Sequence, residues 1–263
     1  MSLINVSNLT FSYEGSYDNI FENVSFQIDT DWKLGFIGRN GRGKTTFLNL
    51  LLGKYAYSGN ISSTVKFEYF PYDVEDKSLY TIEVMKSICT ECMDWEIFRE
   101  ISLLDVQEDA LYRPFNTLSN GEQTKVLLAA LFLTASCFLL IDEPTNHLDI
   151  DARNVVQNYL KRKKGFILVS HDRSLLDQCV DHILSINKTN IEIQKGNFTS
   201  WWENKTLQDN FELAENKKLL KEIGRLSYAA KRSSNWSNKV EKSKYGTTNS
   251  GSKLDKGYVG HKA

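Results

Sequence analysis

The sequence is poor in proline and cysteine and has no long apolar run. Its 263 residues include three prolines, four cysteines and three methionines. The longest uncharged run, residues 126–141, is shorter than the roughly 20 residues that a bilayer span needs. Residues 1–6 have neither the basic region nor the apolar core of a secretory signal. We therefore expect no membrane insertion and a cytoplasmic location, which excludes a membrane-spanning transporter but not a subunit of one.

The four cysteines do not have the pattern of a structural metal site. Cys89 and Cys92 are spaced like a pair of zinc ligands, but zinc needs two more ligands and no second Cys or His pair follows. The interpretation that we favour is a pair of reduced thiols one helical turn apart. Reduced thiols agree with a cytoplasmic location.

The net charge of −1 hides an asymmetry between the two parts of the chain. Residues 1–200 carry 19 basic and 26 acidic side chains, whereas residues 201–263 carry 13 basic and 7 acidic ones. Such a contrast is typical of a polyanion-binding arm attached to an acidic core. A solvated, charged helix that binds nothing explains the composition equally well.

Up to about residue 196, short apolar strands alternate with amphipathic helices. Two of the strands are continuously apolar, as expected of strands buried on both faces of a parallel sheet. The pattern predicts an α/β fold in which helices cover a mainly parallel sheet. A helix-like stretch after residue 78 predicts an inserted helical subdomain, about residues 78–135. The expected strands are residues 3–9, 24–28, 34–37, 137–141 and 166–169, and the expected helices are residues 45–52, 151–162 and 173–179.

A change of composition near residue 200 predicts two domains, residues 1–200 and a basic helical linker, residues 201–263. Apolar residues recur at helical spacing from Leu207 to Ala230, so we expect a long amphipathic helix that ends near Trp236. Residues 239–263 contain almost no aliphatic side chains and are expected to be flexible on their own.

The strongest motif is a phosphate-binding loop, G-R-N-G-R-G-K-T at residues 38–45. It lies after an expected strand and before an expected helix, which is the context that this motif requires. Its glycines let backbone N–H groups point at phosphates, and the helix N-terminus adds positive potential. The alternative is a glycine turn between core elements. The candidate nucleotide-binding residues are Gly38, Arg39, Asn40, Gly41, Arg42, Gly43, Lys44, Thr45 and Thr46.

Two carboxylates follow a second apolar strand about a hundred residues later. Asp142 and Glu143 come at its carboxyl end, where α/β folds place their ligands. We predict that Lys44 holds the β- and γ-phosphates, and that Thr45 and Asp142 hold Mg²⁺. Glu143 is suited to accept a proton from the attacking water, or to orient that water, a role worth roughly 10²–10⁴ in rate. A helix N-cap pair would explain only one of the two carboxylates.

Three further motifs resemble the ATP-binding cassette (ABC) superfamily. L-S-N-G-E-Q at residues 118–123 is similar to its signature sequence, which implies contacts to the ATP of an opposite cassette. The resemblance implies a P-loop NTPase ABC cassette with a helical subdomain and an antiparallel β edge, with ATP and Mg²⁺ as cofactors. The residues that it adds to the site are His171 as the switch histidine, Tyr13 as the aromatic that stacks on adenine, and the signature residues Ser119, Asn120, Gly121 and Glu122.

D-E-P-T-N-H-L-D at residues 142–149, together with V-S-H-D-R at residues 169–173, resembles the ABC-F proteins. These are ATPases with two cassettes on one chain that act on ribosomes. Residues 2–13 and the phosphate loop look most similar to the branch that protects ribosomes against lincosamides, streptogramin A antibiotics and pleuromutilins. This implies hydrolysis of ATP to ADP and phosphate, and a linker that contacts rRNA and P-site tRNA at the peptidyl-transferase centre. The chain covers about the first half of such a protein.

Three positions depart from the family pattern. Tyr72 stands where many cassettes carry a glutamine that senses Mg²⁺ and water. Asn120 replaces a usual glycine of the signature, where we expect a left-handed backbone. Arg42 stands in the phosphate loop where a small residue is commoner.

An ABC site is composite, so the resemblance implies that efficient hydrolysis requires a second cassette or a homodimer. Two alternatives to ribosome protection stay open. One is the ATPase subunit of an ABC transporter, which leaves the basic tail unexplained. The other is a truncated remnant that binds ATP without turnover.

Overall fold

The computed structural model describes residues 2–39, 41–146, 148–187 and 190–244. The chain divides into two compact units, residues 1–202 and residues 203–263. The first unit contains two sheets and six of the helices described below, and α7 (Phe198–Lys244) begins at its end.

The smaller sheet of the first unit is antiparallel, with the strand order β2–β1–β4. Along β1 the buried residues Ile4, Val6 and Leu9 belong to one core, and exposed or half-buried polar residues separate them. This alternation is what a sheet with one solvated face requires. The strands are β1 (Leu3–Phe11), β2 (Phe21–Asp29) and β4 (Ser58–Ser62).

The larger sheet has six strands in the order β5–β6–β7–β3–β8–β9. All neighbouring strands are parallel except β8 and β9, so the sheet is mainly parallel with one antiparallel edge, as predicted. The strands are β3 (Lys33–Ile37), β5 (Lys66–Phe70), β6 (Cys137–Asp142), β7 (Phe166–Val169), β8 (His182–Asn187) and β9 (Asn190–Lys195).

The larger sheet separates two hydrophobic cores. On one face, α1 (Lys44–Leu51) packs between the two sheets, and Phe138 and Leu140 of β6 point into this core. On the other face, Leu139 and Ile141 of β6 pack with the remaining helices. Because both faces are covered, the strand is apolar without a break, which confirms the interpretation of the continuous apolar runs.

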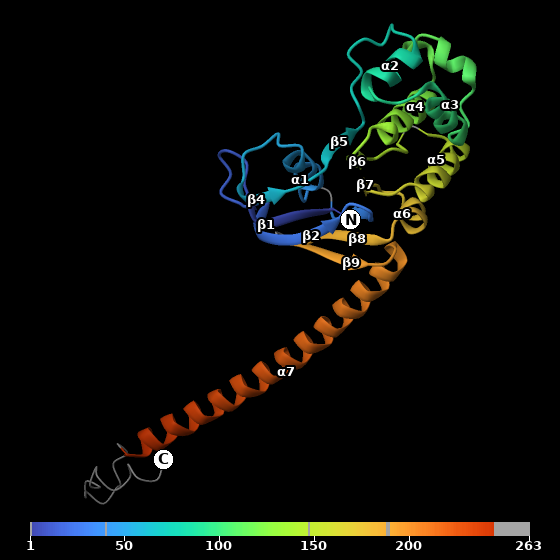
Figure 1. Ribbon diagram of the computed structural model, residues 1–263. Helices are drawn as coiled ribbons and strands as arrows, with labels where there is room; N and C mark the ends of the chain where they lie inside the picture. The colour runs from blue at the N-terminus through green and yellow to red at the C-terminus, as the bar shows by residue number, and fades with distance from the viewer. Residues whose placement is uncertain (1, 40, 147, 188–189, 245–263) are drawn as a thin grey trace, which may run out of the picture. The chain divides into compact units, whose positions relative to one another are not determined.

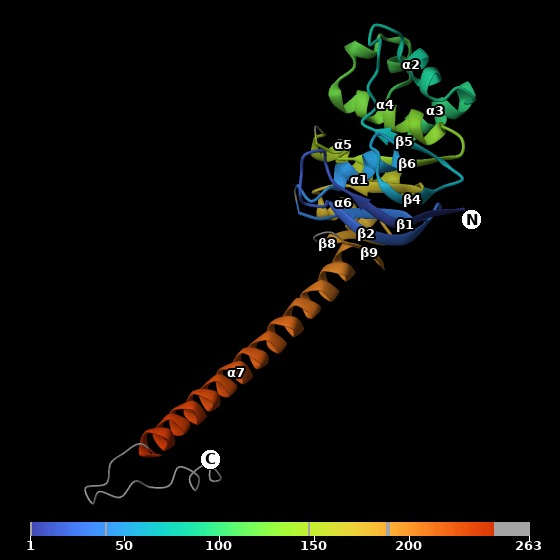
Figure 2. The ribbon, with the colours of Figure 1, turned by 90° about the vertical axis from the view of Figure 1, so that its left-hand side faces the viewer.

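A group of helices lies between β5 and β6 in the chain. Figures 1 and 2 show α2, α3 and α4 gathered at one end of the first unit, remote from β1, β2 and β4. The helices are α2 (Thr81–Ile88), α3 (Asp94–Leu103) and α4 (Asn120–Leu133), and two 3₁₀ turns lie at Glu108–Tyr112 and Phe115–Thr117. After β6 follow α5 (Ile150–Arg162) and α6 (Arg173–Cys179).

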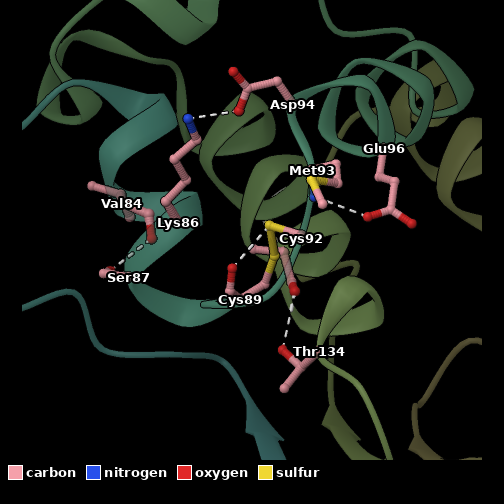
Figure 3. Close-up of a disulfide and its surroundings, with 10 residues drawn as sticks. Val84, Lys86, Ser87, Cys89, Cys92, Met93, Asp94, Glu96 and Thr134 are labelled. Carbon is pink, nitrogen blue, oxygen red and sulfur yellow. Dashed lines mark hydrogen bonds and ion pairs between the residues drawn. A yellow bond between two sulfur atoms is a disulfide. The ribbon is translucent and has the colours of Figure 1, made fainter.

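Cys89 and Cys92 form a disulfide, so the prediction of reduced thiols is wrong (Figure 3). The prediction placed both thiols on one helix. Instead, α2 ends before Cys89, its C-cap, and α3 begins after Met93, its N-cap. The chain reverses between the two helices and brings the two Cα atoms to 5.7 Å, within the usual range for a disulfide.

A buried carboxylate joins α3 to α5 and the residue that follows it. Glu100 has a side chain only 2% exposed, and its Oε2 accepts a hydrogen bond of 2.6 Å from the hydroxyl of Tyr159. The same oxygen accepts a hydrogen bond from Nζ of Lys163, and Oε1 is paired with Arg99 at 3.1 Å. These partners lower the pKa of the Glu100 carboxyl, although burial alone would raise it.

The helix α7 runs over 47 residues. The predicted end near Trp236 is too early, because the helix continues to residue 244, into the stretch predicted to be flexible. Residues 245–263 lie outside the described part of the chain. Beyond Trp202, apolar side chains of this helix such as Leu207, Phe211 and Leu220 are exposed. Within the ranges that the structure describes, no helix combines the length and apolar character that a membrane crossing needs.

Candidate functional site

The phosphate loop connects β3 to α1. Gly43 is the N-cap of α1 with φ of 95°, in the left-handed region, and a Cβ atom there would lie 2.5 Å from Cγ2 of Ile20. Glycine is therefore required on both counts. Nζ of Lys44 donates a hydrogen bond of 2.8 Å to the carbonyl oxygen of Gly38, which folds the lysine back over the loop. Burial lowers the pKa of the Lys44 ammonium, and Glu143 and Asp142 oppose that shift.

Asp142 lies at the carboxyl end of β6 and accepts hydrogen bonds from two other elements. Its Oδ2 accepts one of 3.3 Å from the hydroxyl of Thr45, in the first turn of α1. The same oxygen accepts one of 3.1 Å from the hydroxyl of Tyr69, in β5. Burial raises the pKa of the Tyr69 hydroxyl and the charge of Asp142 adds to the shift, so the tyrosine stays a donor.

Glu143 has an unusual backbone and an incompletely satisfied carboxylate. Its φ is 50°, uncommon for a residue with a side chain, and its N–H donates a hydrogen bond of 2.9 Å to the carbonyl oxygen of Val169. Its Oε2 accepts one of 3.4 Å from the N–H of His171. Its Oε1 is buried without a hydrogen-bond partner among the described residues, with Nε2 of His171 3.5 Å away. Burial raises the pKa of the carboxyl, and His171 partly offsets this.

Tyr13 lies between β1 and β2 and is tied to the start of α1. Its hydroxyl shares a hydrogen bond of 2.7 Å with the hydroxyl of Thr46. Its ring contacts Phe11 and Tyr55 at nearly perpendicular angles, with centroids 5.1 and 5.8 Å apart. The side chain is 42% exposed, so it has surface left for a ligand.

These side chains surround one open cavity of about 460 Å³. Residues from four separate parts of the chain therefore meet at the carboxyl ends of the central strands, where α/β folds bind ligands. Gly38, Arg39 and Arg42 do not line the cavity, and Asn40 lies outside the described residues. The lining residues are Tyr13, Ile20, Gly41, Gly43, Lys44, Thr45, Thr46, Asp142, Glu143, Val169 and His171.

The predicted signature residues lie elsewhere, at the start of α4. Ser119 and Glu122 form a capping box there, in which the Ser119 hydroxyl accepts a hydrogen bond of 3.2 Å from the Glu122 N–H. Oε2 of Glu122 accepts hydrogen bonds of 2.8 Å from both the N–H and the hydroxyl of Ser119, and these bonds lower the pKa of Glu122. Asn120 is the first helical residue, so the expected left-handed backbone at this position is wrong. Gly121 follows it in the same turn.

The geometry at Thr45 and Asp142 fits a Mg²⁺ ion that a nucleotide brings with it. Mg²⁺ takes oxygen ligands and usually combines one or two protein groups with substrate phosphates. The two oxygens from these residues lie 3.3 Å apart and are therefore already adjacent. Elsewhere in the described ranges, no group of three or more His, Cys, Asp or Glu side chains is placed to hold a metal by itself.

Three residues at the site were not predicted from the sequence. Ile20 and Val169 line the cavity, and Tyr69 contacts the predicted Mg²⁺ ligand Asp142. Apolar residues next to a motif give no distinctive signal. Tyr69 lies in β5, which has no clear strand pattern in the sequence, so the sequence does not predict its neighbours across the sheet.

The comparisons with known proteins agree with the fold. Residues 21–146 match the ABC transporter family. A solved structure of a metal-chelate type ABC transporter in an inward-facing conformation covers 74% of this chain and 84% of its own, with a TM-score of 0.62 and 20% identity. The architecture is that of a P-loop ABC cassette.

Two relatives are similar in sequence over most of the chain. The ribosome protection protein VmlR of Bacillus subtilis is 31% identical over 201 residues, 73% of this chain and 35% of the relative. ABC transporter F family member 5 of Arabidopsis thaliana is 27% identical over 210 residues, 77% of this chain and 30% of the relative. The chain therefore spans about a third of the length of each of these curated relatives.

Proposed function

Residues 21–146 match an ABC-type ATP-binding domain, and from that premise we propose that the chain binds ATP with Mg²⁺ in the cavity and hydrolyses it. Domains of this type bind ATP with Mg²⁺ and are ATPases in general. The proposal assigns this activity to the cavity between Tyr13, the phosphate loop and His171.

The proposed roles follow from the position of each group. The Tyr13 ring stacks on the adenine, and Lys44 and the N–H groups at the start of α1 hold the phosphates. Thr45 and Asp142 hold Mg²⁺, which supplies charge neutralisation for phosphoryl transfer when it is bound. Thr45 can donate its proton to Asp142 and keep its lone pairs for the ion.

The observation that carries the proposal is Oε1 of Glu143, which is buried and accepts no hydrogen bond within the described part of the chain. A buried carboxylate oxygen normally has a hydrogen-bond donor, because an unsatisfied one costs free energy. Here the oxygen lies at a cavity wall beside His171, where a water molecule could donate to it. A carboxylate with a raised pKa is a suitable acceptor for the proton of an attacking water.

We propose further that a second cassette completes the site, either in a homodimer or on a longer chain. The signature residues lie outside the cavity of their own cassette, and the N–H groups at the start of α4 are a suitable anion site for a nucleotide held by a partner. Ser119 would then exchange hydrogen bonds within its capping box for contacts to the γ-phosphate.

The proposed target of the ATPase is the ribosome. VmlR is named as a ribosome protection protein, and the second unit of this chain carries an excess of basic side chains that can neutralise RNA phosphates. We propose that ATP-driven closure of two cassettes lets the linker contact rRNA and P-site tRNA, which protects translation from antibiotics at the peptidyl-transferase centre.

Co-sedimentation with bacterial 70S ribosomes tests the target. Glu143→Gln would block hydrolysis, and the variant would be pelleted with ribosomes in the presence and absence of ATP. ATP-dependent pelleting that weakens as salt is raised is the expected result. A chain that binds ATP but stays in the supernatant, also when joined to a second cassette, would contradict the ribosomal role and favour a transporter subunit.

A further inference from the structure

We propose that Tyr69 is a positioning residue for the Mg²⁺ site, one that acts by fixing the carboxylate of Asp142. This inference rests on the proposed binding of ATP with Mg²⁺. Tyr69 does not line the cavity, so it would not touch the nucleotide itself. Its effect would pass through the single hydrogen bond of 3.1 Å to Oδ2 of Asp142.

The register of the parallel strands explains why this tyrosine reaches that carboxylate. Tyr69 of β5 lies opposite Leu140 of β6, and both side chains belong to the core that contains α1. Asp142 follows Leu140 by two residues and therefore points to the same face of the sheet. Two residues along a strand correspond to about 6.6 Å, a distance that the long tyrosine side chain can bridge with its hydroxyl.

The ring of Tyr69 is held by its surroundings, so the hydroxyl is pre-positioned. It is half-buried against the core beside α1, and Nζ of Lys54 lies over the ring, 5.5 Å from its centroid. Lys54 lies just after α1, so the ring of Tyr69 faces the segment that follows the phosphate-loop helix.

Oδ2 of Asp142 therefore accepts hydrogen bonds from two different elements of the fold. Thr45 donates to Oδ2 from α1, and Tyr69 donates to the same atom from β5. Partners of this kind orient a metal-binding carboxylate, and their loss typically costs 10–100-fold in metal affinity. With the donor from β5 removed, Thr45 would be the one remaining described donor to this oxygen, so the carboxylate would be oriented less firmly.

Tyr72, which stands where many cassettes carry a glutamine, does not lie on the face of the sheet that carries Tyr69 and Asp142. Side chains alternate along β5, so Phe70 points to the opposite core, and Tyr72 packs against that same core. Of the two tyrosines, only Tyr69 has a hydrogen bond to Asp142 among the described contacts.

The test is the Mg²⁺ dependence of nucleotide binding by Tyr69→Phe. A fluorescent ATP analogue would be titrated into the full chain at increasing Mg²⁺, and again in EDTA. We expect the Mg²⁺ concentration for half-maximal enhancement to rise about tenfold, with no change in EDTA. Tyr57→Phe is the matched control, because Tyr57 is a half-buried tyrosine against the same core.

Asp142→Ala separates a positioning role from a structural one. If Tyr69 acts through Asp142, adding Tyr69→Phe to Asp142→Ala leaves the Mg²⁺ midpoint unchanged. An unchanged midpoint in the single variant Tyr69→Phe overturns the inference, and so does an equal shift in both backgrounds. A wild-type chain that binds the analogue without any effect of Mg²⁺ would contradict the proposed function instead. Thermal unfolding of each variant checks that it is folded.

Discussion

Two glutamates of the first unit, the buried Glu100 and the half-buried Glu143, differ in what surrounds their carboxylates. Glu100, between α3 and α5, has a donor on each oxygen, and its pKa is lowered despite burial. Glu143, at the cavity, has an oxygen that accepts no hydrogen bond from the described residues, and burial raises the pKa of its carboxyl. Burial alone therefore does not define a reactive carboxylate. Both oxygens of Glu100 have donors, so this carboxylate serves to hold two parts of the fold together. Glu143 lacks a hydrogen-bond donor on one described oxygen, which leaves the carboxylate able to take a proton from a ligand.

The largest expected effect is at the incompletely partnered carboxylate. Glu143→Gln keeps the size of the side chain but cannot accept the proton, so we expect ATP hydrolysis to fall by roughly 10²–10⁴ while nucleotide binding is retained. Phosphate release, measured at concentrations that support a dimer, checks this. The exposed Glu91→Gln is the control, and equal rates in the two variants would mean that Glu143 takes no proton.

At Glu100 we expect an effect on stability and not on ATP hydrolysis. Lys163→Met removes the cation and leaves the buried charge of Glu100 poorly compensated, which typically costs about 3–5 kcal/mol of unfolding free energy. Urea unfolding measures the loss, with the exposed neighbour Lys164→Met as the control. Equal stability of the two variants would show that the contact between α3 and α5 does not depend on this ion pair.

The pKa of Glu100 is lowered and that of Glu143 is raised, so the two carboxyls should change the free energy of unfolding in opposite directions as the pH changes. The folded-state pKa of Glu100 lies below the ordinary 4.5, so its contribution is complete above that value and is lost as pH falls through the lower pKa. The folded-state pKa of Glu143 is raised, so its contribution to the free energy of unfolding is lost as the pH rises through that pKa. The difference in unfolding free energy between wild type and Glu100→Gln should therefore narrow below about pH 4.5. A difference that widens on acidification would contradict the sign.

The smallest expected effect is at the capping box of α4, where Ser119 pairs with a third, more exposed carboxylate, that of Glu122. Glu122 accepts hydrogen bonds from Ser119 in the capping box of α4. Ser119→Ala removes the cap and should lower the unfolding free energy by about 1 kcal/mol, as measured by urea unfolding. Ser119→Thr keeps a capping hydroxyl and is the control. Binding of ATP to the isolated cassette should not change, because Ser119 lies outside its own cavity.

Local features of the site could be predicted from the sequence. The glycine spacing of the phosphate loop, the strand before it and the helix after it all follow from neighbouring residues, and the structure contains each of them. The carboxylates at the end of β6 were predicted in the same way, since a continuous apolar run followed by acidic residues marks the end of a buried strand.

Other parts could not be predicted, for identifiable reasons. β4 and β5 are short, and in β4 Ile61 alone is half-buried while the other four residues are exposed, so β4 lacks the sequence signal of a half-buried strand. The disulfide depends on where α2 ends, and helix ends are the least certain part of a sequence interpretation. The buried ion pair joins two helices about sixty residues apart in sequence.

Residues close together in the chain suffice to predict β3, the phosphate loop and α1 as consecutive elements, because each of these follows from its own local pattern. Which distant side chains meet depends instead on the tertiary structure. Strand register brings Tyr69 to Asp142, and the fold brings Lys163, directly after α5, to Glu100 of α3. Such contacts depend on sheet and helix packing, which fixes distances between residues that no local pattern relates.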